Sequence, residues 1–362
     1  MNIEGLYDLK PDKPDESIYA QAKDRWDSIA KPIDGLGDFE DIICRIASIE
    51  GKLIPEASKK ALVIMCADNG VVCEGVTQTD QSVTAKVASL MTMNKSSVGV
   101  MTKKFGIDII PVDIGINSDI RIEGLIDKKI RRGTGNILRE PAMTKDECLG
   151  AIQTGIDIVK ELSDKGYDIL ATGEMGIGNT TTSTALFCAL TQTDPESITG
   201  RGAGLNDKAL ANKIRVIKDS IAHHRFNRIG LNRSSEMAFE ALRYLGGLDI
   251  ASLVGVYIGA ALTKKPVIID GYISAVAALC ACSIVSETKE YMIASHAGKE
   301  KGTGKILKML DLKPVIDADM ALGEGTGAVM MFPLIDMALD LYSNGTRFDD
   351  TQIDNYERFD KE

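Results

Sequence analysis

Five short apolar segments, each ending at a polar residue beside a glycine, limit the fold of this chain more than any other feature. The segments are rich in Ile, Val and Leu, and longer stretches with helical periodicity separate them. They are KALVIMCA (60–67), IDIIPVDI (107–114), YDILATG (167–173), PVIID (266–270) and EYMIAS (290–295). Such alternation is typical of βαβ units around a parallel sheet, so we predict an α/β fold.

The residues at the ends of these segments indicate a ligand site. In chain order they are Asp68-Asn69-Gly70, Asp113-Ile114-Gly115, Gly173-Glu174-Met175-Gly176, Asp270-Gly271 and His296-Ala297-Gly298. In an open parallel sheet, ligands bind at the carboxyl edge of the strands. A structural turn needs only the glycine. Five endings that add an acid, an amide or a histidine therefore predict a site at that edge.

The overall charge and the terminal sequence exclude several classes of protein. The net charge of −10 argues against a nucleic-acid partner, because binding to polyphosphate depends on clustered Lys and Arg. No apolar run approaches the ~20 residues that cross a bilayer. The N-terminal MNIEGLYDLKPDKPDES is acidic and lacks the basic and then apolar layout of a signal peptide. We therefore expect a cytoplasmic protein without a membrane partner.

Metal ions are not expected. The seven cysteines are scattered through apolar segments, which predicts small buried side chains in a reducing compartment. Cys280 and Cys282 form only a CxC pair, without a second pair at zinc-like spacing. His296 is separate in the sequence from the only other histidines, His223 and His224.

The segment GEMGIGNTTTSTAL (173–186) has the composition of an anion-binding turn. A predicted strand runs into three glycines, and a predicted helix then begins at Asn179-Thr180. Glycines let backbone N–H groups approach an anion, and a helix N-terminus adds free donors and partial positive charge. Glu174 would repel a phosphate, so its presence favours a bound hydroxyl or base nearby. A capped helix after a glycine turn is the alternative.

Three further segments have the composition of loops around a polar site. GRGAGLNDKALANK (200–213) carries three glycines, Arg201, and Lys208 and Lys213 on a predicted helix, and could clamp a phosphate or ribose. ASHAGKEKGT (294–303) contains the hydroxyl of Ser295, and CADNGVVCEGVTQTDQSVT (66–84) contains a polar run around Thr79. Ordinary solvated loops remain the alternative for all three.

The segment ALGEGTGAVMMFPLIDMAL (321–339) places Glu324 between Gly323 and Gly325, before a long apolar helix. A carboxylate in such a turn is expected to be partly desolvated, which would raise its pKa toward the value that a general base needs. The alternative is a carboxylate that caps the helix. Capping requires no flanking glycines, so the glycines favour the base.

At these segments, and at Lys31-Pro32 and Leu36-Gly37, the chain resembles the nicotinate-nucleotide:dimethylbenzimidazole phosphoribosyltransferase family. The segments occur in the same order over nearly the whole chain, and GEMGIGNTT and LGEGTGA are the specific signatures. The resemblance implies transfer of phosphoribose from nicotinate mononucleotide to an aromatic base, with α-ribazole phosphate and nicotinate as products. It implies neither a metal nor a redox cofactor.

The resemblance also implies roles for individual residues. Glu324 corresponds to the family's catalytic base, and Glu174 to a second carboxylate near the reacting centre. Residues in segments that surround the substrates are Gly176, Asn179, Thr180, Gly202, Lys213 and Ser295 around the nucleotide, and Thr79 and Val87 in the acceptor loop.

The implied architecture is a Rossmann-like parallel sheet with helices on both faces, plus a small helical domain, assembled as a dimer. We predict that residues 1–58, with some C-terminal residues, form the small domain. Residues 59–345 would form the Rossmann-like domain, and 346–362 a polar tail.

Some positions depart from the family pattern and leave the acceptor open. This chain has Asn69 where the family often has His, and KPIDGLG where the family has KPPGSLG. It has Val87 where some benzimidazole-using members carry a polar side chain. Benzimidazoles, purines and phenols therefore all remain candidate acceptors. A phenol-activating or catalytically silent subunit of a heterodimer is an alternative to a homodimer. Another nucleotide-processing enzyme, or a nucleotide-binding regulator, is a further alternative.

Overall fold

The computed structural model describes residues 1–227 and 234–358. Its centre is a six-stranded sheet with the order β3-β2-β1-β4-β5-β6, in which every pairing is parallel. The strands are β1 (Lys60–Ala67), β2 (Ile107–Gly115), β3 (Ile126–Asp127), β4 (Ile169–Met175), β5 (Val267–Ile269) and β6 (Met292–Ala294). This is the strand order of a Rossmann fold, which confirms the predicted fold class.

All five predicted apolar segments form strands of this sheet, and three strands were not predicted. These are the two-residue β3 and a separate parallel pair, β7 (His296–Gly298) and β8 (Ile316–Met320). The sequence of β8, IDADM, is polar and partly exposed, so it lacks the apolar signal of a buried strand.

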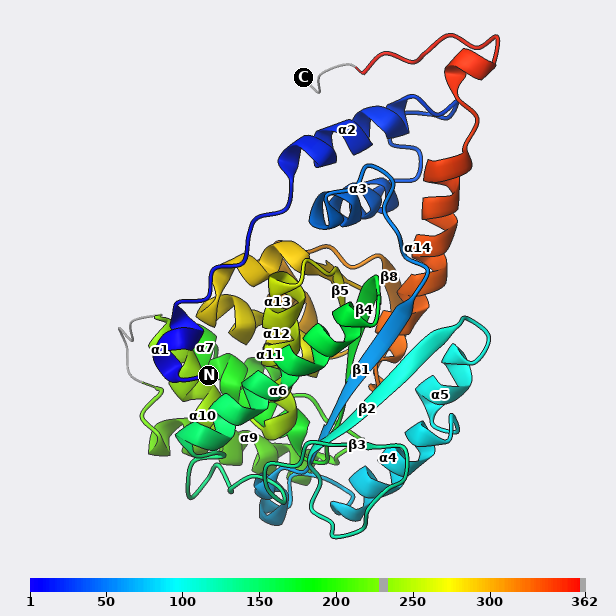
Figure 1. Cartoon of the computed structure of the whole chain (residues 1–362). Helices are drawn as coiled ribbons and strands as arrows, with labels where there is room; N and C mark the ends of the chain where they lie inside the picture. Colours follow the sequence, from blue (N-terminus) through cyan, green and yellow to red (C-terminus); the bar gives the residue numbers. More distant parts are fainter. Residues whose placement is uncertain (228–233, 359–362) are drawn as a thin grey trace.

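Helices cover both faces of the sheet (Figure 1). The side chains of β1 alternate between two cores: Ala61, Val63 and Met65 belong to one, and Leu62, Ile64 and Cys66 to the other. The first core also contains side chains of α6 (Lys145–Asp164), α7 (Asn179–Thr191), α10 (Ser235–Leu245), α11 (Leu248–Leu262) and α12 (Tyr272–Ile284). The second contains side chains of α3 (Asp38–Glu50), α4 (Ser82–Thr92), α5 (Ser97–Thr102) and α14 (Thr326–Asn344).

The helices α6 and α11 approach each other closely because glycines face each other across their contact. A Cβ on Gly155 would lie 2.0 Å from the carbonyl oxygen of Ser252, and a Cβ on Gly255 would lie 2.0 Å from that of Ile152. Nearly every residue of α11 is buried, including Asp249 and Ser252. Any substitution of either glycine would force the helices apart.

Two of the N-terminal helices pack at the end of the molecule where β1 begins, away from the carboxyl edge (Figure 1). Here α2 (Glu16–Asp27) and α3 contact the last turns of α14: Arg25 donates to the carbonyls of Tyr342 and Ser343, and Tyr342 donates to that of Leu53. An isolated antiparallel bridge joins Ile29 to Arg347. The predicted boundaries at 58 and 345 stay predictions.

The remaining helices are α1 (Ile3–Tyr7), α8 (Pro195–Ile198), α9 (Asp207–His223) and α13 (Thr303–Met309), with short 3₁₀ turns at Gly70–Glu74, Ser286–Tyr291 and Phe348–Asp350. Within residues 1–227 and 234–358, no helix is both long enough and apolar enough to cross a membrane. Five of the seven cysteines are buried as expected and Cys282 is half-buried, but Cys73 is exposed on the 3₁₀ turn after β1, so the prediction was wrong there.

Candidate functional site

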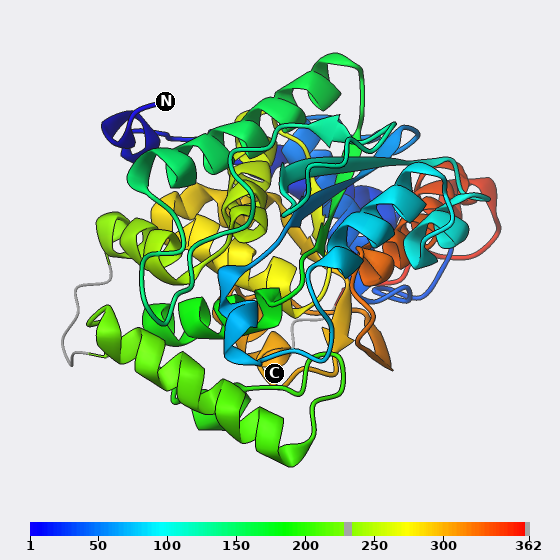
Figure 2. The same ribbon diagram turned by 90° about the horizontal axis from the view of Figure 1, so that it is seen from below.

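The predicted site residues converge on the carboxyl edge of the sheet, which Figure 2 views from below. The chain leaves the centre of the sheet in opposite directions at β1 and β4, so these two neighbours form the topological switch point. Glu174 lies at the end of β4, opposite Met65 of β1. An open crevice at a switch point is where such folds bind ligands.

Glu174 is held by an amide that it shares with a second buried acid. Asn179, the first residue of α7, donates Nδ2 to Glu174 Oε2, and the same nitrogen lies 3.0 Å from Asp249 Oδ2. Asp249, near the start of α11, is fully buried. One amide group therefore connects two carboxyl groups behind the crevice.

Burial makes these carboxyl groups hard to ionise. Desolvation raises the pKa of Glu174 to about 8, and the negative charges of Asp249, Asp270 and Glu324 act in the same direction. Desolvation likewise raises the pKa of Asp249 to about 7, against the hydrogen bond from Asn179. A cation bound beside Glu174 would lower its pKa again, because opposite charge favours the carboxylate.

Gly176 is required by close packing behind this pair. A Cβ there would lie 2.4 Å from the carbonyl oxygen of Ala67 and 2.6 Å from Asp249 Oδ2. The glycine lets the turn after β4 fold back against the end of β1. The sequence predicted this turn but not the reason for its second glycine.

Glu324 lies in a loop of three consecutive residues with left-handed backbone: Gly323 and Gly325 have φ of +86°, and Glu324 has +60°. A glutamate rarely adopts this conformation, so the surrounding contacts must hold it there. Its Oε2 accepts from the backbone N–H of Val98 in α5 at 3.2 Å. A Cβ on Gly323 would lie 3.0 Å from Glu174 Oε1, so the loop places the two glutamates next to each other.

Asp270, at the end of β5, fixes this loop. Its carboxylate accepts from the backbone N–H groups of Gly325, Gly327 and Ala328 at 3.1, 2.9 and 3.1 Å. Asp270 thereby caps α14. Glu324 is free of the capping role that the sequence left open for it on this helix.

A buried lysine lies on the other side of the glycine-rich turn after β4. Lys213 of α9 is 1% exposed and donates Nζ to Thr180 Oγ1 of α7 at 2.8 Å. A Cβ on Gly202 would lie 3.3 Å from Thr180 Oγ1 and 3.5 Å from Lys213 Nζ. Three predicted residues from two segments thus meet at one point, as expected of a phosphate site.

Ser295 is buried, and its hydroxyl is hydrogen-bonded to the neighbouring His296. Its Oγ lies 2.9 Å from His296 Nδ1, and its carbonyl oxygen accepts from the N–H groups of Val315 and Ile316. The ring of His296 in turn fills the space beside Gly327, where a Cβ would lie 2.0 Å from Nδ1. Ser295 therefore lies beside the His296 ring, and it is this ring that packs against the start of α14.

The two predicted acceptor residues lie on either side of the start of α4. Val87 is half-buried within α4 and packs against the second core. Thr79 is exposed in the preceding loop, and the neighbouring Gln78 donates to the carbonyl oxygen of Gly204. That bond joins the acceptor loop to the glycine-rich loop beside Lys213.

A small cavity lies beside Glu174 and Asp270. It is lined by Glu174, Asp270, Tyr272, His296, Glu300 and Gly323, among others, and measures about 40 Å³. Ligand pockets typically measure roughly 300–1,000 Å³, so a nucleotide would fill this cavity with only part of its structure. The rest would lie over the open edge of the sheet.

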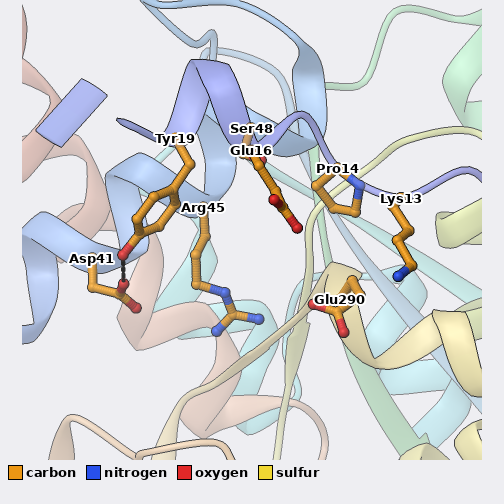
Figure 3. A pocket seen from close by; sticks show the side chains of 8 residues that line it. All are labelled: Lys13, Pro14, Glu16, Tyr19, Asp41, Arg45, Ser48 and Glu290. Atoms are coloured by element: carbon orange, nitrogen blue, oxygen red, sulfur yellow. Dashed lines mark hydrogen bonds between the residues drawn. The ribbon is translucent and has the colours of Figure 1, made fainter. Parts of the chain in front are cut away.

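A larger hollow of about 350 Å³ lies among the N-terminal helices (Figure 3). Its lining is of mixed charge, with Lys13 and Arg45 near Glu16, Asp41 and Glu290. Arg45 donates to the carbonyl oxygen of Met292, and Tyr19 donates to Asp41. None of the predicted site residues lines this hollow, and its balanced charges select no class of ligand.

The sequence did not predict Asp249 as a member of the site, nor the role of Asp270 in holding the loop of Glu324. Asp249 follows Gly246-Gly247 at the start of an apolar helix, where an acid resembles an ordinary first-turn residue. Asp270 was noted as a strand ending, but its three backbone bonds join segments more than fifty residues apart. Periodicity and motif spacing carry no signal for either contact.

The buried acids predict that stability falls as the pH rises through neutrality. Burial raises the pKa of Asp68 to about 6, as it raises those of Asp249 and Glu174 to about 7 and 8. The unfolded values lie near ~4. Between these values the folded state binds more protons than the unfolded state, so the free energy of unfolding decreases with pH.

Each such group contributes a slope of up to roughly 1.4 kcal/mol per pH unit. We expect urea unfolding to give a lower free energy of unfolding at pH 8 than at pH 6, and the decrease to become smaller in Glu174→Gln. A free energy that rises over this interval would show that the carboxyl groups ionise without a burial cost.

Comparison with known proteins identifies close relatives of the chain. A phosphoribosyltransferase family model matches residues 12–353. Nicotinate-nucleotide–dimethylbenzimidazole phosphoribosyltransferase of Acetivibrio thermocellus is 43% identical over 334 residues, which cover 92% of this chain and 93% of the relative. The protein of the same name from Clostridium acetobutylicum is 42% identical over 357 residues, covering 98% and 99%.

A solved structure supports the same relationship. The crystal structure of nicotinate-nucleotide-dimethylbenzimidazole phosphoribosyltransferase from Thermus thermophilus superposes with a TM-score of 0.85 at 30% identity, and covers 93% of this chain and 98% of that one.

Proposed function

This chain belongs to the phosphoribosyltransferase family of the nicotinate-nucleotide–dimethylbenzimidazole enzymes, and we propose that it transfers phosphoribose from nicotinate mononucleotide to an aromatic lower-ligand base. The products are an α-ribazole phosphate, for cobamide synthesis, and nicotinate. The observation that carries the proposal is the position of Glu174 and Glu324 beside each other at the switch point, with the Lys213–Thr180 pair on the same edge.

The charges of the site suit the donor. Nicotinate mononucleotide carries a pyridinium cation at one end of the ribose and a phosphate at the other. The carboxyl groups of Glu174 and Glu324 would lie toward the pyridinium and the anomeric carbon, where positive charge develops in the transition state. Lys213, Thr180 and the backbone at Gly202 would hold the phosphate.

The reaction needs one proton acceptor and no proton donor. The acceptor base forms a bond to the anomeric carbon while the bond to the pyridinium nitrogen breaks, and that electron pair stays on nicotinate as a neutral ring nitrogen. Attack on the face opposite the leaving group converts a β-nucleotide into an α-product. The proton that the acceptor loses passes to Glu324, acting as general base.

Purified chain mixed with nicotinate mononucleotide and dimethylbenzimidazole, adenine or p-cresol tests the proposal. We expect nicotinate release with at least one of these acceptors, and chromatography with mass detection would identify the ribotide. Absence of turnover with all three would favour a silent subunit. Release only with p-cresol would identify a phenol-activating enzyme.

The proposal includes a cytoplasmic location and a dimer, either of two identical chains or of this chain with a related one. Light scattering of the purified chain distinguishes these two. We expect twice the mass of one chain for a homodimer, and the mass of a single chain where a related partner is required.

Asp270 is expected to act through the loop that carries Glu324. In the wild type, both carboxylate oxygens of Asp270 accept hydrogen bonds from backbone N–H groups. In Asp270→Asn, the side-chain NH₂ replaces one of these oxygens and cannot accept, so the left-handed loop loses part of its support. We expect kcat to fall by roughly 10- to 100-fold, because a displaced catalytic group loses reactive geometry.

The same change at an exposed acid controls for the loss of charge. Asp146 lies in the first turn of α6 and is exposed, so Asp146→Asn should keep its activity. Equal rates for both variants would show that Asp270 does not position Glu324.

A further inference from the structure

A buried pair, Asp68 and Thr84, connects the acceptor side of the site to the nucleotide side. Asp68 directly follows β1 and Thr84 lies in the first turn of α4, and both are fully buried. Thr84 donates Oγ1 to Asp68 Oδ1 at 2.6 Å. The other carboxylate oxygen of Asp68 accepts from the N–H of Asn117, in the loop after β2, at 2.8 Å.

The hydroxyl of Thr84 also contacts the nucleotide turn. It accepts from the backbone N–H of Ile177 at 3.2 Å, and Ile177 lies between Gly176 and Gly178 in the turn after β4. One hydroxyl thus donates to the end of β1 and accepts from the end of β4. These are the two strands of the switch point.

A second set of bonds holds the start of α4 in the same place. Gln81 donates Nε2 to the carbonyl oxygen of Asn69 at 3.0 Å and accepts from Asn117 Nδ2 at 2.7 Å. The residue before α4 makes no side-chain cap of its own. Asp80 also accepts from the N–H of Ser82 at 2.8 Å, which supports the first turn locally, and the tertiary bonds of Gln81 hold this turn against the ends of the strands.

Val87 lies on α4 one turn after Thr84, and residues three apart face the same side of a helix. A displacement at Thr84 would therefore move Val87 and the loop around Thr79 relative to Glu174. Misplacement of a reactant by about 1 Å can lower a rate by about 100-fold.

We propose that Asp68 and Thr84 are positioning residues that fix α4 against the nucleotide turn, and so set where the acceptor lies relative to the anomeric carbon. The inference rests on the proposed function. It states that the hydrogen bonds of this pair fix the acceptor site relative to the nucleotide site. Neither side chain touches the reacting atoms.

Thr84→Val tests the pair, because it keeps the shape of the side chain and removes both hydrogen bonds. We expect kcat/KM for the acceptor to fall about 10- to 100-fold, while the dissociation constant for nicotinate mononucleotide, measured by calorimetry without acceptor, changes by no more than about threefold. Thr84→Ser retains the hydroxyl and is expected to restore most of the activity. Asp68→Asn, which leaves a single carbonyl acceptor, should resemble Thr84→Val.

Thr288→Val is the matched control. Thr288 is fully buried and donates to the carbonyl of Val285 in a 3₁₀ turn that precedes β6, away from the carboxyl edge. This variant should lose stability without a change in either substrate parameter. It separates the effect of a lost buried hydrogen bond from the effect of a displaced helix.

The outcomes distinguish this inference from the proposed function. A wild-type chain that releases no nicotinate with any acceptor overturns both. An active wild type whose Thr84→Val and Asp68→Asn variants match Thr288→Val overturns the inference alone. So does an equal loss of nucleotide and acceptor binding, or a Thr84→Ser variant no better than Thr84→Val. Should Thr84→Val not fold, Thr84→Ser and Asp68→Asn decide the question by the same two parameters.

Discussion

Replacing Glu324 with Gln is expected to lower kcat by roughly two to four orders of magnitude, which is the contribution of a general base. In the wild type, Glu324 Oε2 accepts from the N–H of Val98 at 3.2 Å. Gln has a side chain of the same size, and its carbonyl oxygen can accept the same hydrogen bond. The loop should therefore keep its shape while it loses its proton acceptor. The measurement is the steady-state release of nicotinate at saturating acceptor.

The acidity of the acceptor provides a sharper test of this role. An acceptor that already loses its proton easily needs less help from a base. Among phenols that the wild type accepts, we expect the ratio of wild-type to Glu324→Gln rates to shrink as the phenol becomes more acidic. A constant ratio would mean that Glu324 acts by charge or by position. Glu161→Gln, an exposed change on α6, is the control for loss of a carboxylate.

The sheet was predictable because its strands are buried on both faces. After Lys60, the run ALVIMCA is apolar throughout, and every residue of β1 is buried, so periodicity was not needed to recognise the strand. The same logic fails for β8, because the run IDADM is partly exposed and owes its conformation to pairing with β7. Two-residue β3 is too short to leave any signal.

The location of the site was predictable, but the contacts within it were not. Strand endings and glycine spacing placed Glu174, Asn179 and Glu324 at one edge. The bond between Thr180 and Lys213 spans 33 residues, and the bond between Asn179 and Asp249 spans 70, so no local pattern encodes them. The roles assigned to these residues stay predictions that the variants described above would test.

The capping role shows how a local rule can point to the wrong residue. An acid just before a helix is usually its cap, so Glu324 was weighed as one for α14. In the structure the cap comes from Asp270 of a different strand. A glutamate that is not needed for capping, in a conformation that glutamate rarely adopts, is more consistent with a functional constraint than with a structural one.

Replacing Lys213 with Met is expected to weaken binding of nicotinate mononucleotide by roughly 10- to 150-fold, as for the loss of a charged hydrogen bond to phosphate. Stability should not fall, because an apolar side chain of similar length removes the cost of a buried charge. Lys213→Arg is not expected to rescue binding, because the site is closed by Thr180 and by the backbone at Gly202. Lys208→Met, on the exposed face of the same helix, controls for lost charge.

A donor without phosphate shows whether Lys213 recognises that group. With nicotinate riboside, the wild type and Lys213→Met should bind equally, because the group that Lys213 contacts is missing. An unchanged 10- to 150-fold difference would instead show that Lys213 supports the fold of the turn through Thr180.

The pH dependence of binding follows from the burial of the same side chain. Desolvation lowers the pKa of Lys213 to about 8, while the charge of Glu300 acts in the opposite direction. Above that pH the free protein loses the cation, and the affinity of the wild type for nicotinate mononucleotide should decline. The ratio of wild-type to Lys213→Met affinity should therefore fall above pH 8, because only the wild type loses this proton, whereas ionisation of Glu174, whose pKa is also about 8, affects both proteins alike. If both variants decline in parallel above pH 8, the titrating group is another one, and the phosphate site must be sought elsewhere on this edge of the sheet.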